Sequence, residues 1–311
     1  MTKYIYICSA GHSGSTLLDL LIGSHSRIES LGEIAQLSKN IALNTTCSCG
    51  QPVRSCPLWL PVLGRLGNEL GVDLLEEPYA LHMGYIRASS VIDRTHQTRA
   101  YLLRRQVVLG LYYLRLHFDW AALDGLTRPV VDAIDNNVRV FEAVRSVAGA
   151  GAVVDSSKSY LKALALYRRH PDRVRVILLT RDGRAVMWSN LKRGTNRRDA
   201  VRDWSRHYSR ALPLLYKFVR PDHLLHVRYE ELARFTPDVI RAICEFIEMP
   251  FESGMLDFRS KVHHLANGNR MRMSRSSEIR LDEEWTTRLS PDDRRYFDLQ
   301  AGPLNRRFGY S

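Results

Sequence analysis

A strand, a glycine loop and a helix follow one another at the start of the chain. Residues 4–8 form a continuous apolar run, as expected of a strand buried on both faces of a sheet. Gly11 and Gly14 then allow a tight loop, and a helical pattern begins at Ser15. In such a unit, backbone N–H groups and the positive end of the helix dipole face the same point. The sequence therefore predicts a binding site for phosphate or a similar anion.

The loop lacks the lysine that nucleotide triphosphatases carry. Their motif is G-x-x-x-x-G-K-[ST], in which the lysine reaches the terminal phosphates. Counted back from Gly14, Ser9 occupies the first glycine position, and Ser15 occupies the lysine position. This difference argues against an ordinary ATP or GTP hydrolase.

Four short apolar runs predict strands, and each is followed by a helical pattern. These runs are residues 4–8, 152–155, 174–180 and 224–228. Alternation of this kind predicts an α/β fold with a P-loop-like central parallel sheet and helices on both faces. The ligand site of such a fold lies beyond the carboxyl ends of the strands. We expect one domain, with a mostly helical insertion at roughly residues 58–148.

Composition restricts the ligand class and the location. The formal net charge of +12 favours anionic ligands. Arginines of one helical stretch alternate with acids, which indicates a solvated helix face and argues against nucleic acid as a partner. The residues are Arg193, Arg197, Arg198, Asp199, Arg202, Asp203, Arg206 and Arg210. No stretch approaches the roughly 20 apolar residues of a membrane span, so we expect a cytoplasmic protein without a transmembrane segment.

A second motif follows the apolar run 174–180. Arg181 stands at the predicted strand end, and Ser189 follows eight residues later, about two helical turns away. The planar guanidinium and the short hydroxyl could converge on one phosphate. An arginine at a strand end is more often part of a structural ion pair, but together with the glycine loop the motif gains weight.

With these motifs the sequence resembles the sulfotransferases that use 3′-phosphoadenosine 5′-phosphosulfate (PAPS). The resemblance is to a bacterial branch related to tyrosylprotein and carbohydrate sulfotransferases, and it spans most of the chain. The segments that carry it are residues 11–18, 181–189, 228–232, 263–272 and 305–310. It implies a single sulfotransferase domain over residues 1–311.

The resemblance also implies a cofactor site. The glycine loop would bind the 5′-phosphosulfate, and Arg181 with Ser189 would bind the 3′-phosphate. Tyr229 would lie near the adenine, and residues 263–272, called the late loop below, would close over the cofactor. The implied cofactor-binding residues are Gly11, His12, Ser13, Gly14, Ser15, Thr16, Arg181, Ser189, Tyr229, Gly268, Asn269 and Arg270. The product would be adenosine 3′,5′-bisphosphate. Because a sulfuryl group carries less negative charge than a phosphoryl group, no metal is obligatory.

Three residues are candidates for catalysis. The resemblance places the base at Glu33, which could instead stabilise the dipole of a helix over residues 34–39. Lys158 matches a family lysine that would offset charge on the leaving oxygen. His12 occupies a position that is Lys or Arg in many members; it can donate a hydrogen bond, but it is charged only when protonated. Cytosolic relatives use a histidine base, so four others stay open: His82, His96, His117 and His207.

Three of the five cysteines lie close together in a turn-rich segment, as Cys47, Cys49 and Cys56. A structural zinc site usually has four ligands, and no histidine lies near these three in the sequence. A cytoplasmic chain would normally keep the thiols reduced. The sequence therefore predicts no metal site, and it leaves the role of the cysteines open. Cys8 and Cys244 are expected to be small core residues.

Two other functions compete with sulfuryl transfer. Asp155 ends a predicted strand, as the Mg²⁺ carboxylate of a P-loop kinase-like phosphotransferase does, although it could equally cap a helix near Ser159. The missing loop lysine disfavours the kinase. The third possibility is a non-catalytic protein that binds a nucleotide or a sulfated glycan, which the presence of Glu33 and Lys158 disfavours.

The acceptor has no readable motif. Its binding site is expected in the insertion at roughly residues 58–148, which would serve as a lid or an acceptor-side subdomain. A small molecule, a glycan, a lipid or a peptide could each supply the hydroxyl group. The sequence does not indicate the oligomeric state.

Overall fold

A five-stranded parallel sheet forms the centre of the protein. The computed structural model describes residues 2–84, 98–118, 120–274 and 276–311. The strand order is β2-β3-β1-β4-β5, with every neighbouring pair parallel. The strands are β1 (Tyr4–Ser9), β2 (Ile28–Ser30), β3 (Ala152–Lys158), β4 (Val174–Thr180) and β5 (Leu224–Arg228). The predicted α/β fold is thus confirmed, and β2 is a strand that the sequence did not reveal.

Strand β1 lies in the middle of the sheet, and all of its residues are buried. Its pairing with β4 is regular, whereas its pairing with β3 shifts between Tyr6 and Cys8. Tyr6 pairs with Asp155, and Cys8 pairs with Lys158. Lys158 has a φ of 71°, so this irregularity turns the end of β3 at the carboxyl edge of the sheet, where the ligand site is expected.

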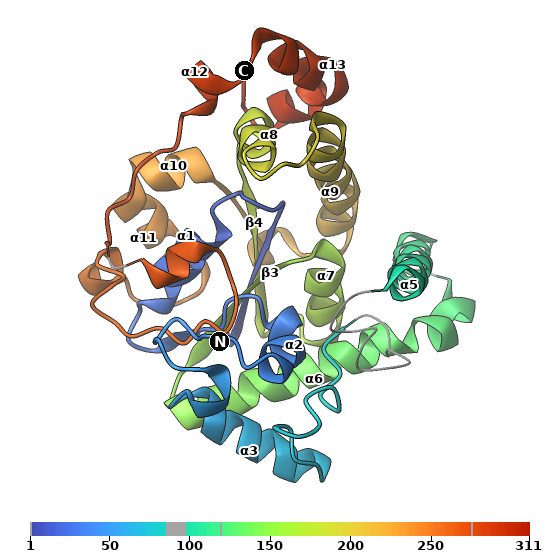
Figure 1. Cartoon of the computed structure of the whole chain (residues 1–311), viewed down its shortest axis with the longest axis vertical. Helices are drawn as coiled ribbons and strands as arrows, with labels where there is room; N and C mark the ends of the chain where they lie inside the picture. Colours follow the sequence, from blue (N-terminus) through green and yellow to red (C-terminus); the bar gives the residue numbers. More distant parts are fainter. Residues whose placement is uncertain (1, 85–97, 119, 275) are drawn as a thin grey trace.

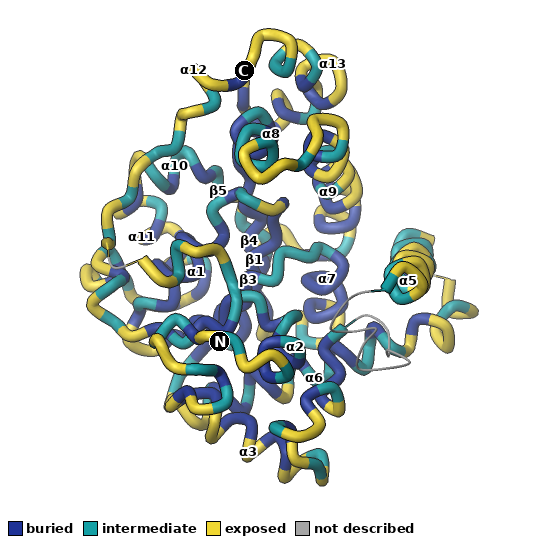
Figure 2. The backbone as a smooth tube through the Cα atoms, viewed as in Figure 1, coloured by how far each residue is buried: buried dark blue, intermediate teal, exposed yellow. Residues whose placement is uncertain are grey.

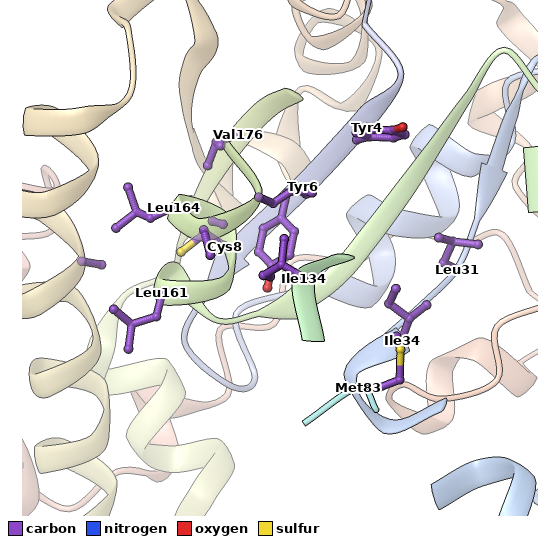
Figure 3. Packing of buried hydrophobic residues seen from close by; sticks show 14 of the residues in the cluster. Tyr4, Tyr6, Cys8, Leu31, Ile34, Met83, Ile134, Leu161, Leu164 and Val176 are labelled. Atoms are coloured by element: carbon purple, nitrogen blue, oxygen red, sulfur yellow. The ribbon is translucent and has the colours of Figure 1, made fainter. Parts of the chain in front are cut away.

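Helices cover both faces of the sheet (Figure 1). One apolar core includes residues of α1 (Ser15–Gly23), α10 (Tyr229–Arg234) and α11 (Thr236–Phe246). The other core includes residues of α7, α8, α9 and α6 (Asp124–Ala148), and Figure 3 shows Leu161, Leu164 and Ile134 of this cluster near Tyr6 and Cys8 of β1. Further bounds are α7 (Tyr160–Arg169), α8 (Gly183–Leu191) and α9 (Arg197–Phe218).

The segment between β2 and β3 is largely helical. It contains α2 (Leu37–Ala42), α3 (Trp59–Leu70), α5 (Arg99–Phe118) and α6 (Asp124–Ala148), while residues 85–97 lie outside the described part. Helix α5 lies at the periphery against α6, and only Tyr112 and Leu116 of its side chains are buried (Figure 2). A lid or acceptor-side role for this segment stays a prediction.

The C-terminal region packs against the end of β4. It contains α12 (Trp285–Arg288) and α13 (Pro291–Arg307). Asn305 Oδ1 accepts a hydrogen bond from the Gly183 backbone N–H at 2.9 Å, and the hydroxyls of Tyr310 and Thr180 lie 3.1 Å apart. These contacts fix the turn that carries Arg181.

Short 3₁₀ turns join several of these elements. They are η1 (Ile34–Gln36), η2 (Val53–Ser55), η3 (Ala121–Leu123), η4 (Pro221–His223), η5 (Ser253–Leu256) and η6 (Arg270–Met273). Within the described residues, no helix combines the length and the apolar character that crossing a bilayer would need.

Candidate active site

The glycine loop between β1 and α1 is supported by contacts with the Tyr208 hydroxyl and packs against the Tyr229 ring. Gly14 has a φ of 88°, and a Cβ atom there would come within 2.4 Å of Tyr229 Cδ2. The Tyr208 hydroxyl accepts from the Ala10 N–H at 3.1 Å, donates to the Leu179 carbonyl at 2.8 Å and lies 3.4 Å from Ser13 Oγ. Only glycine fits at position 14, and helix α9 supports the loop through Tyr208.

A pocket of about 750 Å³ opens beside this loop. It brings together most of the site residues that the sequence and the resemblance suggested: Gly11, His12, Gly14, Ser15, Thr16, Glu33, Lys158, Arg181, Ser189, Tyr229, Gly268 and Asn269. Two of the suggested residues do not line it. The Ser13 residue of the glycine loop is buried, and Arg270 is exposed.

Arg181 is held in place on several sides. Its Nη1 donates to the His12 carbonyl at 3.1 Å, and its Nη2 donates to Asp282 Oδ2 at 3.0 Å. The guanidinium also lies 4.5 Å from the centroid of the Tyr229 ring. Its side chain is only 7% exposed. This planar cation is therefore already oriented in the pocket before any ligand arrives.

The late loop touches the first turn of α1 directly. The Asn269 N–H donates to Thr16 Oγ1 at 3.3 Å, and Gly268 also lines the pocket. Gly32, with a φ of 66°, approaches the same loop so closely that a Cβ would lie 2.3 Å from the Asn267 carbonyl oxygen. One loop thus contacts both the anion-binding unit and the turn that carries Glu33.

Glu33 and Lys158 form an ion pair in the pocket. The turn that carries Glu33 is tied to β3, because the Ser156 N–H donates to the Gly32 carbonyl at 2.9 Å and the Ala35 N–H donates to Ser157 Oγ at 3.2 Å. The helix predicted over residues 34–39 is a 3₁₀ turn followed by α2. Glu33 precedes that turn without a side-chain capping bond, so its partner is Lys158.

His12 lies among cations. Burial is the main cause that lowers the pKa of His12 below its ordinary 6.5, and the charges of Arg193, Lys158 and Arg181 add to this effect. The Glu33 carboxylate acts in the opposite direction. The lowered pKa favours the neutral form of His12, which can still donate a hydrogen bond.

The sequence did not single out four charged residues that also line the pocket: Arg193, Glu278, Arg280 and Asp282. Arg193 was assigned to a solvated helix face, although its position four residues after Ser189, about one helical turn, could have placed it beside the anion site. Arg280 and Asp282 come from the segment before α12 and belong to no recognisable motif.

Comparison with known proteins decides the family. The sulfotransferase family model matches residues 84–253, more than half of the chain, and this stretch includes Arg181 and Ser189. The chain belongs to the sulfotransferase family. The glycine loop precedes the matched stretch, so its assignment rests on its own residues and geometry. No curated protein matches the sequence significantly.

Three solved structures share the fold of this sulfotransferase. The sulfotransferase domain of the Synechococcus PCC 7002 olefin synthase has 19% identity and a TM-score of 0.55, covering 100% of this chain and 95% of that one. The sulfotransferase domain of the curacin biosynthetic pathway has 18% identity and a TM-score of 0.51, covering 97% and 98%. Sulfotransferase STF9 from Mycobacterium avium has 16% identity and a TM-score of 0.52, covering 100% and 78%.

The other candidate bases of the sulfotransferase lie elsewhere. Of the four histidines left open, His82 is buried against the Pro129 carbonyl, and His117 stacks on Tyr113. Burial lowers the pKa of His207 to about 4. None of these three lines the pocket, and His96 lies outside the described residues.

Asp155 is buried within the fold, and it does not line the pocket. Its Oδ1 accepts from the Ser157 N–H at 2.8 Å. The expectation that it caps the next helix is wrong, because the Ser159 side chain caps α7 by accepting from the Lys162 N–H. Burial raises the pKa of Asp155, and the nearby Lys162 ammonium opposes that shift.

Proposed function

We propose that this sulfotransferase moves the sulfuryl group of PAPS to a hydroxyl acceptor, with Glu33 as the base. One observation carries the proposal: the Glu33–Lys158 ion pair lines the same pocket as the glycine loop and Arg181. A base, a cation and two separate anion-binding elements are the parts that such a transfer requires.

The residues of the pocket fit the donor. The glycine loop with the start of α1 would hold the 5′-phosphosulfate, and Arg181 with Ser189 and Arg193 would hold the 3′-phosphate. Arg181 Nε is buried without a hydrogen-bond partner among the described residues, so the guanidinium keeps an unused donor. The volume of about 750 Å³ lies within the range of roughly 300–1,000 Å³ that is usual for small-molecule sites.

Each catalytic side chain has a separate task in the proposed reaction. PAPS supplies an activated sulfuryl group. Lys158 would stabilise negative charge on the oxygen that leaves, Glu33 would accept the proton of the acceptor hydroxyl, and His12 would donate a hydrogen bond to the transferring group. Because Glu33 and Lys158 pair with each other in the free protein, donor and acceptor would each offer one of them a new partner.

The structure gives less support to a kinase. Ser15 occupies the lysine position of the triphosphatase loop, and Asp155 is buried away from the pocket that would contain Mg²⁺. A carboxylate that does not reach the pocket cannot ligate a metal bound to phosphates there. The non-catalytic alternative differs only in turnover, so activity must distinguish it.

The first test is calorimetry with adenosine 3′,5′-bisphosphate in EDTA, with ADP and ATP as competitors. We expect tight binding that needs the 3′-phosphate and no metal. Binding of ATP that appears only with Mg²⁺ would contradict the proposal and favour the kinase.

The second test measures turnover. PAPS labelled in its sulfuryl group is incubated with a panel of small alcohols and phenols, glycans, lipids and tyrosine peptides, in buffer with EDTA. Transfer of the label to one class would identify the acceptor. Nucleotide binding without transfer to any class would favour the non-catalytic alternative.

A further inference from the structure

Three cysteines and a histidine from distant parts of the chain meet beside α3. Cys47, Cys49 and Cys56 precede this helix, and His264 joins them from the late loop across a separation of 208 residues. In Figure 1 the light-blue segment before α3 lies near the orange late loop. The histidine that the sequence argument lacked is therefore supplied by the fold.

The ligand atoms have the spacing of a metal site. All four lie within 4.8 Å of one another. Cys56 Sγ lies 3.7 Å from both Cys47 Sγ and Cys49 Sγ, and 3.2 Å from His264 Nδ1. In a regular tetrahedron with Zn–S bonds of about 2.3 Å, the sulfur atoms are about 3.8 Å apart. A disulfide would instead need a separation of about 2.05 Å, and all these thiols are free.

The backbone around the four residues is ordered by its own hydrogen bonds. Gly50, with a φ of 89°, donates its N–H to the Cys47 carbonyl at 2.9 Å, and this turn holds Cys47 and Cys49 close together. Trp59 Nε1 donates to the His264 carbonyl at 2.7 Å, and Ser48 Oγ donates to the His263 carbonyl at 2.6 Å. The ligands are thus presented by a fixed framework on both sides.

We infer that Cys47, Cys49, Cys56 and His264 form a structural zinc site that joins the segment before α3 to the late loop. Three thiolates and one imidazole make a complete tetrahedral set, which leaves no position for a substrate. Zinc binding displaces the thiol protons and cross-links the two segments, as a disulfide would do in an oxidising environment.

This site has a mechanical consequence for the pocket. His264 lies four residues before Gly268, and the same loop contacts Thr16 through the Asn269 N–H. Loss of the metal releases one end of that loop, so residues 263–273 should exchange their amide hydrogens faster. The zinc assignment itself does not depend on the proposed sulfuryl transfer.

The test is metal analysis of the full chain, expressed with zinc and purified without chelators. Mass spectrometry of the metals should find one zinc ion per chain, and the Co²⁺-substituted protein should show the strong visible bands of a tetrahedral thiolate site. His264→Ala and Cys56→Ser should lose the metal and speed amide exchange at residues 263–273. The matched control Cys244→Ser, which changes another buried free cysteine, should keep the metal.

A second variant guards against misfolding. His264→Cys retains four ligands, so it should keep the zinc while a fourth thiolate changes the Co²⁺ spectrum. A folded wild-type protein that takes up neither zinc nor Co²⁺ would overturn the site. An unchanged metal content and Co²⁺ spectrum in His264→Ala would overturn the assignment of His264.

Discussion

Glu33 owes its position to β3 rather than to the helix that follows it. The Ser156 N–H donates to the Gly32 carbonyl, and Ser157 Oγ accepts from the Ala35 N–H, so the turn is fixed on both sides of Glu33. Further back, Asp19 of α1 accepts from both Ser30 and Ser156, which ties the first helix to β2 and β3. Burial raises the pKa of Asp19 to about 7. A base that must meet an acceptor in one geometry gains from such a rigid support.

The first prediction concerns this base. Glu33→Gln keeps the shape of the side chain but cannot accept a proton, so kcat should fall by about 10²- to 10⁴-fold. Affinity for adenosine 3′,5′-bisphosphate should stay within a factor of about two, because the carboxylate is not part of the proposed phosphate contacts. Rates from the label-transfer assay and affinities from calorimetry measure the two effects.

Glu69→Gln is the matched control, since Glu69 is an exposed glutamate of α3 that pairs with Arg65. It should change neither quantity. A Glu33→Gln enzyme that turns over at the wild-type rate would remove Glu33 as the base.

The second prediction concerns His12. Its pKa is lowered in the free protein, and a bound anion would raise it again. Binding of adenosine 3′,5′-bisphosphate should therefore take up a proton, and affinity should increase as the pH falls through the interval between the free and bound pKa values. Calorimetry in buffers of different ionisation enthalpy measures this uptake.

His12→Gln keeps a hydrogen-bond donor and removes the titration, so its affinity should lose that pH dependence. The idea fails if the variant and the wild type take up the same number of protons on binding.

The sequence located many of the residues that line the pocket, because they belong to short local motifs. Arg181 and Ser189 belong to one strand end and the helix that follows it, and Gly14 belongs to one loop, so neighbouring residues in the sequence were enough to identify them. Asp282 could not be found in this way, since its pairing with Arg181 spans 101 residues and follows no local pattern. His264 was missed as a partner of the cysteines for the same reason. Contacts between distant segments depend on how the whole chain packs.

At the scale of elements, the conformation of the glycine loop between β1 and α1 depends on the helices that pack against it. Tyr208 of α9 supports the loop from inside, and Tyr229 of α10 packs on Gly14 from outside. The Arg181 guanidinium also lies over the Tyr229 ring. The two anion-binding elements are thus coupled through one aromatic side chain.

The third prediction tests this coupling. Gly14→Ala places a methyl group where Tyr229 Cδ2 lies 2.4 Å away, in a backbone conformation that alanine disfavours. The ring should be displaced together with Arg181, and affinity for adenosine 3′,5′-bisphosphate should fall by at least about tenfold, which corresponds to about 1.4 kcal/mol. Calorimetry measures the affinity, and thermal unfolding measures the stability.

Gly71→Ala separates the two causes, because Gly71 has a φ of 69° but no atom of the described residues would lie within 4 Å of a Cβ there. Both variants should lose stability from backbone strain, by about 1 kcal/mol. Only Gly14→Ala should lose nucleotide affinity. Equal affinities in the two variants would contradict the coupling through Tyr229.

The pattern of elements was predicted well where a mostly apolar run is followed by a helical pattern. The strands β4 and β5 begin and end at the predicted residues, and β1 and β3 extend beyond the predicted ends. Strand β2 was missed because it is short and contains the charged Glu29, so neither length nor apolar character marks it. The irregular pairing that turns Lys158 into the pocket is equally invisible in the sequence, since it depends on how β1 and β3 align.

At the scale of the whole molecule, the net charge of +12 produces a positive electrostatic field that favours a polyanionic ligand. The distance over which this field acts depends on charge pairing at the surface and on screening by salt. Many arginines of the surface are paired with acids, as Arg241 is with Asp238 and Arg202 with Asp199. At an ionic strength of 0.1 M, charges beyond a distance of about 10 Å are largely screened. The cations of the pocket should therefore contribute more to ligand affinity than the remaining surface does.

The fourth prediction follows from this argument. Affinity for adenosine 3′,5′-bisphosphate should fall steadily between about 0.1 and 1 M salt, where the screening length shrinks from about 10 to 3 Å. Arg193→Gln, at the pocket, should weaken binding and reduce the salt dependence. Arg241→Gln removes the same charge from a distant helix, and it should change neither quantity. A different outcome is that Arg241→Gln reduces the salt dependence as much as Arg193→Gln does. In that case the long-range field of the whole surface attracts the ligand, and the pairing of surface arginines with acids does not cancel that field.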